Sequence, residues 1–341
     1  MKIAVAGAGW FGCHVAAELI AAGDQVTVFE REGEMFRAAS GSNQNRLHRG
    51  FHYPRSYETR IESQAGFVKF KEKYPNLSSA VKLNIYAVAD RLSSLDFETY
   101  LQIMDATRLE YSVTDGQSLG LQNISGAIVC DERLVETSRA RKYFMGLLHP
   151  YIRMGVAVNS IERVENGVLV NGERYDALID CTWGSLGSDD DDLDCYFEPV
   201  IMFLYQGSAG HPAITIMDGP FFSIYPYEND IYSLSSVTHT PIGQYATHGA
   251  AKKIIDQIGS ELVSERRQAM ESEVAYYFPE FGQTFKHVGH QTAVKLKLND
   301  ASATRGCIVH MVERTITVTP GKIDSIFYAY DEVAKHLSTI R

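Results

Sequence analysis

Three glycines and one acidic residue near the N-terminus have the types and spacing of a phosphate-binding turn. Gly7, Gly9 and Gly12 follow the apolar segment 3–6, and Glu30 ends the next apolar segment. The first glycine permits a tight turn, the second lets backbone approach a pyrophosphate, and the third allows close packing of a helix on a strand. The carboxylate of Glu30 suits hydrogen bonds from ribose hydroxyls. This pattern predicts the binding of a dinucleotide.

The elements around these residues must form a strand, a helix and a second strand. Segment 3–6 reads as the first strand, and a helix that starts near Trp10 and Phe11 directs its unpaired N–H groups and positive dipole end at the phosphates. Glu30 repels a 2′-phosphate, which favours an adenosine diphosphate group, while the adjacent Arg31 keeps the phosphorylated analogue open. The alternative reading is a glycine turn that only packs a helix on a strand. The agreement of glycines, strand, helix and acid favours the nucleotide site.

Composition excludes several classes of partner. The formal net charge is −10, and no block of Lys and Arg occurs in the 341 residues, which argues against nucleic acid or an anionic membrane as partner. A chain of this length favours two modules that share a cleft. A small anionic substrate bound by a few arginines stays open.

The cysteines, histidines and apolar segments indicate the cellular compartment of the protein and whether it binds a metal. The five cysteines are scattered without a CxxC pair, which fits a reducing compartment, and we expect a cytoplasmic protein. The first strand begins at once, leaving no room for a signal peptide, and no apolar run approaches the length of a membrane span. The eleven histidines show no HExxH-like spacing, so we expect no metal.

The remaining chain predicts an α/β fold in which a Rossmann-like domain with a central parallel sheet accompanies a substrate domain on a mostly antiparallel sheet with helices. Helices are expected at 55–74, 94–106, 134–152, 248–258, 260–277 and 323–337. Strands are expected at 84–89, 177–181, 197–206, 212–218, 221–228, 230–239, 291–298, 308–312 and 315–321, with hairpin turns at 166–167 and 171–172.

The predicted division into domains is discontinuous. Residues 1–75, 125–190 and 305–341 form the nucleotide-binding domain, and residues 76–124 and 191–304 form the substrate domain. The acidic run 189–192, with Asp194, lacks the ligand spacing of a calcium loop and is interpreted as a solvated linker.

A polar loop, 39–53, is the second feature that could carry chemistry. Its sequence SGSNQNRLHRGFHY, residues 40–53, resembles the loop after the second strand in the D-amino acid oxidase superfamily of FAD proteins, which includes glycine and sarcosine oxidases, and especially its L-2-hydroxyglutarate dehydrogenase branch. The matching positions are Ser40, Gly41, Asn43, His48, Gly50 and Tyr53. The strand end at 176–184 and the late turn TPGKI, 319–323, extend the resemblance, which does not cover the central sheet closely.

The resemblance implies FAD bound in an extended form. Pyrophosphate would lie at the glycine turn, ribose at Glu30, and the isoalloxazine ring against the loop, with the late turn at the pyrimidine end of the flavin. The cofactor-binding residues expected on this basis are Gly7, Gly9, Trp10, Phe11, Gly12, Glu30, Arg31, Ser40, Asn43, Gln44, Asn45, Arg46, Leu47, Ile161, Thr182, Gly184, Gly321, Lys322 and Ile323.

The same resemblance implies candidates on the substrate side. His48 matches a family histidine near the flavin, and Lys295 matches by position a lysine that promotes reaction with oxygen in amine-oxidising relatives; a surface lysine is the alternative. Arg46 could hold a substrate carboxylate through a bidentate fork or pair with a nearby acid. Further substrate-binding candidates, each with an ordinary structural alternative, are His52, Tyr53, Tyr225 and Arg305.

These observations predict an FAD-dependent oxidoreductase, either an oxidase or a dehydrogenase. It would oxidise a C–N or C–O bond of a small amino acid, amine or 2-hydroxy acid by hydride transfer to flavin N5. The arginines named above favour a substrate that bears a carboxylate. Two alternatives stay open, namely a nicotinamide-dependent dehydrogenase and a non-catalytic nucleotide-sensing module. The electron acceptor, the covalent or non-covalent state of the flavin and the oligomeric state are not predicted.

Overall fold

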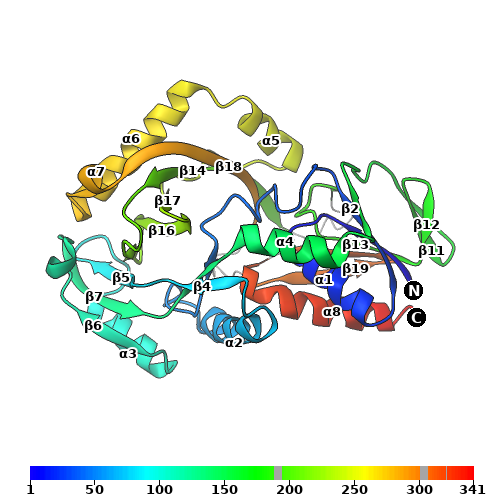
Figure 1. Cartoon of the computed structure of the whole chain (residues 1–341), viewed down its shortest axis with the longest axis horizontal. Helices are drawn as coiled ribbons and strands as arrows, with labels where there is room; N and C mark the ends of the chain where they lie inside the picture. The colour runs from blue at the N-terminus through cyan, green and yellow to red at the C-terminus, as the bar shows by residue number, and fades with distance from the viewer. Residues whose placement is uncertain (188–193, 300–305, 320) are drawn as a thin grey trace.

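Both chain termini lie at one end of the elongated molecule (Figure 1), where a six-stranded sheet carries the glycine turn. The computed structural model describes residues 1–187, 194–299, 306–319 and 321–341. In spatial order the six strands are β19 (Ile308–Val312), β20 (Thr315–Thr319), β13 (Ala177–Asp180), β1 (Lys2–Ala6), β2 (Gln25–Glu30) and β9 (Ile152–Met154). Neighbours pair in parallel except β19 with β20. Parallel strands place their carboxyl ends along one edge, where ligands bind in such sheets.

Both faces of this sheet are covered, which is why β1 is apolar throughout. Ile3 and Val5 pack in a core that also holds residues of three helices, α1 (Trp10–Ala21), α4 (Thr137–Leu148) and α8 (Ile326–Ser338). Ala4 and Ala6 alternate to the other face and pack against a small antiparallel sheet. That sheet consists of β10 (Ile161–Val164), β11 (Gly167–Val170) and β12 (Glu173–Tyr175).

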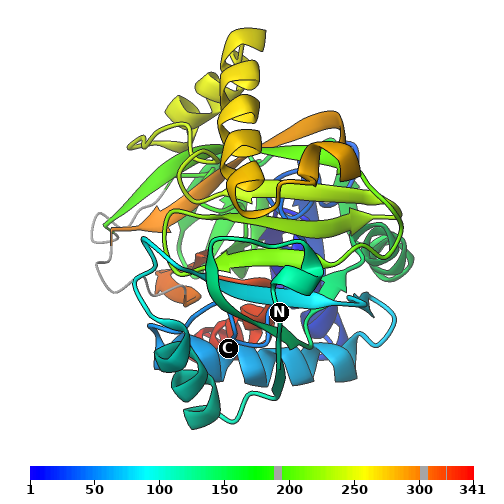
Figure 2. The same ribbon diagram turned by 90° about the vertical axis from the view of Figure 1, so that its left-hand side faces the viewer.

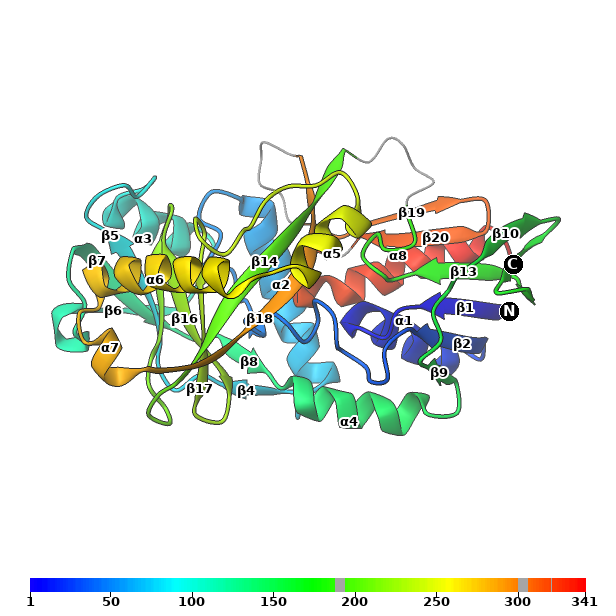
Figure 3. The same ribbon diagram turned by 90° about the horizontal axis from the view of Figure 1, so that it is seen from above.

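An eight-stranded sheet forms the other end of the molecule (Figure 3). Its strands are, in spatial order, β18 (Lys286–Leu298), β14 (Cys195–Gln206), β17 (Ile231–Ser236), β16 (Phe222–Glu228), β15 (Ala213–Met217), β5 (Asn84–Ala89), β7 (Ile124–Cys130) and β6 (Tyr111–Thr114). Neighbours are antiparallel except β15 with β5. The expected mostly antiparallel sheet is therefore confirmed.

Helices cover the outer face of this second sheet, and the other face meets the polar loop. Helix α6 (Ser260–Tyr277) runs across the strands (Figure 2) and packs on Ile85 and Ala87 of β5 in one core. Tyr86 and Val88 alternate to the opposite face, where they pack with Phe51 and with α3 (Phe97–Ala106). The remaining helices on the outer side are α5 (His248–Asp256) and α7 (Phe281–Thr284).

A third group of elements connects the two sheets. It contains α2 (Tyr57–Lys73) and a small sheet of β3 (Arg46–Leu47), β8 (Arg133–Val135) and β4 (Ser78–Ala80). Two short 3₁₀ turns, η1 (Gln117–Leu119) and η2 (Ile323–Ser325), complete the described elements. Strand β3 pairs with β8 in the register Arg46 to Leu134, so the polar loop is fixed at its centre by backbone hydrogen bonds.

The α/β fold class is confirmed, and the differences from the predicted elements have local causes. Helix α3 begins three residues later than predicted because Asp96 caps it, accepting a hydrogen bond of 2.8 Å from the Thr99 N–H. The predicted helix 134–152 ends at Leu148, and its last residues instead enter β9. The predicted strand 291–298 begins earlier, at Lys286. The acidic run 189–192 lies outside the described residues.

Candidate functional site

A cavity of about 380 Å³ lies at the carboxyl ends of the first sheet. It extends between the glycine turn and the late turn around Gly321, two segments from opposite ends of the chain. The predicted cofactor residues that line it are Gly7, Gly9, Trp10, Phe11, Glu30, Arg31, Ser40, Asn43, Thr182, Gly321 and Ile323. The structure thus brings the N-terminal unit, the polar loop and the late turn to one cavity.

The glycine turn has no room for a side chain at Gly7 or Gly12, and at Gly9 only the Ser40 side chain stands in the way. Gly7 adopts a φ of +93°, and a Cβ on Gly12 would lie 1.9 Å from the Gly7 carbonyl oxygen. A Cβ on Gly9 would lie 2.6 Å from the Ser40 Oγ. Helix α1 follows directly, without a side-chain cap at Gly9, and the Trp10 N–H donates to Ser40 Oγ at 3.1 Å. The turn therefore presents bare backbone and a helix N-terminus to the cavity, as phosphate groups require.

Glu30 is held at the end of β2 by backbone donors. Its carboxylate accepts hydrogen bonds from Ala8 N–H at 2.7 Å and from Glu32 N–H at 2.9 Å. These bonds fix the carboxylate beside the glycine turn, at the place where ribose hydroxyls are expected.

Replacing Glu30 with alanine is expected to weaken FAD binding about 10- to 100-fold. A hydrogen bond to a charged group contributes about 1.5–3 kcal/mol, and each 1.4 kcal/mol changes affinity about tenfold. Fluorescence titration of FAD into the apoprotein measures the effect. Glu32→Ala is the matched control, because the Glu32 side chain is half exposed and pairs with Arg31. Equal affinities for both variants would contradict the ribose assignment of Glu30.

The other predicted cofactor residues lie beside the cavity or away from its wall. Ile161 is exposed on β10, and residues 156–159 line the cavity where an adenine contact was expected. Gly12 packs against the glycine turn, and Gly184 packs against Phe197. Gln44, Asn45, Arg46 and Leu47 continue from Asn43 into β3, and Lys322 contacts Tyr53.

Several lining residues were not found from the sequence. They are Ala6, Ala8, Phe29, Phe36, Arg37, Ala38, Ala39, Val156, Ala157, Val158, Asn159, Cys181, Trp183, Ser185 and Leu186. Residues 156–159 follow β9, which was predicted as the end of a helix, so their position at the carboxyl edge of the sheet was missed. Trp183 lies in the strand end 176–184 that the sequence already indicated, so it could have been predicted to line the cavity.

The polar loop is anchored by its own side chains and by the second sheet. Asn43 Nδ2 donates to the Ala39 carbonyl at 2.6 Å, and its Oδ1 accepts from the Asn45 N–H. Gln44 Nε2 donates to the Ser223 carbonyl at 3.1 Å, and Gln291 Nε2 donates to the Asn43 carbonyl at 3.3 Å. Strands β16 and β18 therefore hold the loop from the side opposite the nucleotide-binding sheet.

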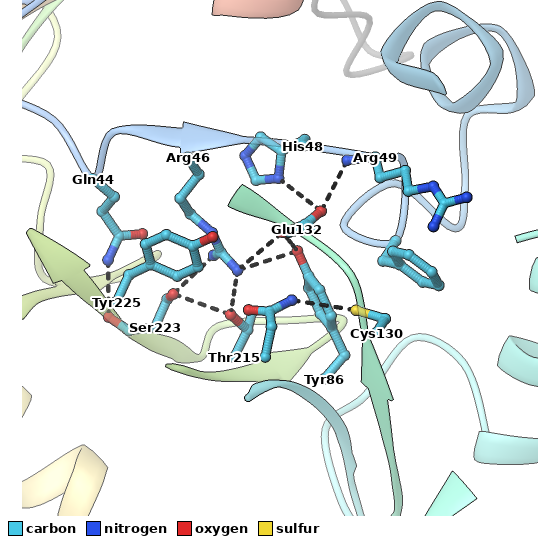
Figure 4. A network of polar contacts seen from close by, with 12 residues as sticks. Gln44, Arg46, His48, Arg49, Tyr86, Cys130, Glu132, Thr215, Ser223 and Tyr225 are labelled. Carbon is cyan, nitrogen blue, oxygen red and sulfur yellow. Dashed lines mark hydrogen bonds and ion pairs between the residues drawn. The ribbon is translucent and has the colours of Figure 1, made fainter. Parts of the chain in front are cut away.

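Arg46 lies at the centre of a buried polar network (Figure 4). Its Nη1 donates to Ser223 Oγ at 2.9 Å, and its Nη2 donates to Thr215 Oγ1 at 2.8 Å and to Tyr86 OH at 3.1 Å. Nη2 also lies 3.6 Å from Glu132 Oε2. Both terminal nitrogens thus contact protein groups, which favours pairing of Arg46 with an acid over a fork that holds substrate.

Glu132 is the acid of this network and was not singled out in the sequence. Its side chain is fully buried, Tyr86 OH donates to Oε2 at 2.8 Å, and the Arg49 N–H donates to Oε1 at 3.1 Å. Burial raises its pKa, but contacts with His48, Arg46 and Tyr86 outweigh burial and hold the pKa below its ordinary value. Glu132 is therefore ionised at neutral pH.

His48, His52, Tyr53 and Lys322 lie together beside this network. The rings of His48 and His52 stack with centroids 5.3 Å apart, and Tyr53 meets both rings edge-on. Lys322 Nζ lies 3.1 Å from the centroid of the Tyr53 ring, which joins the late turn to the polar loop. Burial lowers the pKa of His48, Glu132 raises it, Arg46 and Lys322 lower it again, and the pKa stays below its ordinary value. His48 is accordingly neutral at pH 7.

The other substrate-side candidates lie in different surroundings. Tyr225 is fully buried, its ring lies 4.2 Å from the Arg46 guanidinium, and its hydroxyl donates to the Arg133 carbonyl. Lys295 lies on β18, four residues after Gln291 and on the same face of the strand. Arg305 lies outside the described residues.

Comparison with known proteins identifies the family. Residues 2–293 match the family described as FAD dependent oxidoreductase (DAO). The chain is 39% identical over 333 residues to FAD-dependent monooxygenase FPY4 of Fusarium mangiferae, which covers 97% of this chain and 90% of that protein. It is 26% identical over 372 residues to FAD-dependent monooxygenase kojA of Aspergillus flavus, covering 100% of this chain and 86% of that protein. The solved structure of glycine oxidase from Geobacillus kaustophilus has the same fold, with a TM-score of 0.70 at 13% identity over 98% of this chain and 94% of that one.

The chain belongs to the FAD-dependent oxidoreductase family. It is an enzyme whose cofactor is FAD, and the observed cavity fits that cofactor, because the bare glycine turn, Glu30 and the Gly321 turn all face one space. Among the residues that the structure describes, no helix is long and apolar enough to cross a membrane. Within the same residues, no group of three or more His, Cys, Asp or Glu side chains is arranged to hold a metal ion.

Proposed function

We propose that the enzyme oxidises a C–N or C–O bond in a small carboxylate-bearing molecule, an amino acid, an amine or a 2-hydroxy acid. The observation that carries this proposal is the group of His48, His52, Tyr53 and Lys322, which does not line the cavity itself and adjoins it through Lys322, between the lining residues Gly321 and Ile323. Bound FAD supplies the two-electron acceptor, taking a hydride at N5. The protein residues must then bind the substrate, orient its C–H bond and take its proton.

Each residue of this group has a proposed task. His52 and Tyr53 supply hydrogen-bond donors to the substrate. Lys322 adds a positive charge at the Gly321 turn, which favours an anionic group bound there. His48, neutral at pH 7, accepts the substrate proton. Arg46 fixes the polar loop through its hydrogen bonds to the hydroxyls of Ser223, Tyr86 and Thr215. Lys295 keeps the proposed role of assisting the reaction with oxygen.

Replacing His48 with alanine is expected to leave FAD bound and to slow its reduction about 10²- to 10⁴-fold, the usual contribution of a general base. Stopped-flow absorbance under anaerobic conditions measures the reduction. Exposed His149, which follows α4, offers the matched control, His149→Ala, which should reduce at the rate of the unaltered enzyme. Loss of FAD from the His48 variant would remove the support for a catalytic role.

The reduction rate is expected to fall at acid pH and to be flat near pH 7 to 8. Because burial lowers the pKa of His48 below its ordinary value of 6.5, the neutral base is the predominant form at pH 7. Protonation at lower pH removes the base, so the rate should drop about tenfold for each pH unit below that pKa. A rate that rises through pH 7 to 9 would instead indicate a base of higher pKa.

A screen for anaerobic bleaching of the bound flavin tests the proposed function. Glycine, sarcosine, D- and L-alanine, proline, lactate and 2-hydroxyglutarate are mixed with the oxidised holoenzyme, and dithionite shows that the flavin can be reduced. Bleaching by at least one C–N or C–O substrate supports the proposal. Bleaching by dithionite alone, combined with a change in oligomeric state on FAD binding, would favour the nucleotide-sensing alternative.

A second candidate function is oxygen insertion, favoured by the 39% identity to a protein named FAD-dependent monooxygenase. Both functions begin with FAD reduction or use the reduced cofactor, but they differ in the fate of oxygen. Turnover under ¹⁸O₂ separates them, because a monooxygenase places one labelled atom in the product, whereas an oxidase releases both as hydrogen peroxide.

A further inference from the structure

The ion pair with Arg46 does not account for all the contacts of the Glu132 carboxylate. A fully buried carboxylate is costly, and Arg46 with Tyr86 already compensates its Oε2 side. The Oε1 side meets the Arg49 N–H at 3.1 Å and points at the imidazole of His48, whose Nδ1 lies 3.4 Å away (Figure 4). Among the residues that the structure describes, the buried His48 Nδ1 makes no hydrogen bond, so Glu132 Oε1 is its near neighbour and not yet its hydrogen-bond partner.

We propose that Glu132 is a positioning residue for His48, a role that rests on the proposed function. Its carboxylate, which can only accept, selects the imidazole form with a hydrogen on Nδ1 and leaves Nε2 as the proton acceptor. The contact of 3.4 Å is longer than a typical hydrogen bond, and such contacts in enzymes often shorten when substrate binds.

In the proposed step, one proton moves from the substrate to His48. The O–H or N–H bond of the substrate breaks, its bonding pair stays on the heteroatom, and the proton forms a new bond to Nε2. The hydrogen on carbon leaves with both electrons of its bond to the FAD. The imidazole thereby becomes a cation, and Glu132 at 3.4 Å provides the countercharge in a site shielded from water.

The charges around His48 come from several elements, and Glu132 is the negative one in contact with the ring. Arg46 on β3 and Lys322 on the late turn are positive and disfavour the imidazolium. His52 and Tyr53 on the loop contact the ring edge or face. Removal of the carboxylate therefore leaves Arg46 and Lys322 unopposed by the group that raises the pKa of His48, and the affinity of the ring for a proton must fall.

Nuclear magnetic resonance of the FAD-loaded enzyme, labelled with ¹⁵N in its histidines, tests this role without a substrate. The spectrum of His48→Gln assigns the His48 signals. In the unaltered enzyme at pH 7.5 we expect Nδ1 to carry the hydrogen and Nε2 to be unprotonated. In Glu132→Gln the titration midpoint of His48 should fall by about 1 to 3 pH units, the effect of losing a nearby opposite charge.

Two further variants control the experiment. Asp131→Asn removes a half-exposed carboxylate from the adjacent position and should leave the His48 midpoint unchanged. Glu132→Asp keeps the charge, so its His48 titration midpoint should lie close to that of the unaltered enzyme. Hydrogen on Nε2 in the unaltered enzyme would overturn the proposal even if Glu132→Gln does not fold, and so would equal midpoints in Glu132→Gln and the unaltered enzyme. A failure of every substrate to bleach the flavin would overturn the proposed function and leave these signals as they are.

Discussion

A tryptophan at position 9 is expected to give a folded, colourless protein. In Gly9→Trp the new Cβ meets only the Ser40 side chain, with Oγ at 2.6 Å and Cβ at 3.5 Å, and the hydroxyl can rotate away. The indole must then extend into the cavity, because Gly9 lines it, and occupy the space of the pyrophosphate. We expect FAD affinity to fall by at least about 10³-fold, since both the volume and the backbone donors of the turn are lost.

Absorbance of the purified protein and titration with FAD measure this effect, and circular dichroism checks the fold. The matched control is Gly146→Trp on α4, where an added Cβ meets no atom within 4 Å. This control should remain yellow. A yellow Gly9→Trp protein with the affinity of the control would mean that FAD does not pass over the glycine turn.

Replacing Arg46 with methionine is expected to lower the free energy of unfolding by about 3–5 kcal/mol, because it leaves Glu132 as an uncompensated buried charge. The hydroxyls of Thr215 and Ser223 also lose their shared partner. Urea unfolding measures the change. Arg55→Ala is the control, because Arg55 pairs with Asp218 at 2.7 Å but is exposed, and exposed pairs contribute about 0–1 kcal/mol.

A double-mutant cycle shows whether the cost arises from the pair. Combining Arg46→Met with Glu132→Gln removes both charges, so the double variant should lose less stability than the two single losses added together. The expected coupling is about 0.5–3 kcal/mol, as for residues that share one network. Strict additivity would show that Arg46 stabilises the loop through its hydroxyl partners without Glu132.

The nucleotide-binding half was predictable because its signals are local. The turn, the helix that follows and the acid at Glu30 are read within one continuous stretch, and the parallel sheet follows from that unit. Strand β9 was missed because the helix that ends at Leu148 was predicted to continue to Ile152, and the three residues Ile152–Met154 are too few to show a period of two. Residues 156–159 were missed with it.

The centre of the network could not be predicted, because its members are brought together only by the tertiary fold. Arg46 contacts residues of β5, β15 and β16, which are 40 to 177 positions away along the chain. Glu132 lies between Asp131 and Arg133 in a charged triplet, a pattern typical of an exposed turn. Only the pairing of β3 with β8 places this turn beneath the polar loop and buries the carboxylate.

A crystal structure of the enzyme with FAD tests the central claim most directly. Pyrophosphate should lie over Gly7 to Gly12, ribose at Glu30, and the isoalloxazine ring between the loop at 43–48 and the turn at 321–323, with His48 beside the ring. An isoalloxazine ring distant from both of these segments would contradict the proposed site and every role assigned to His48.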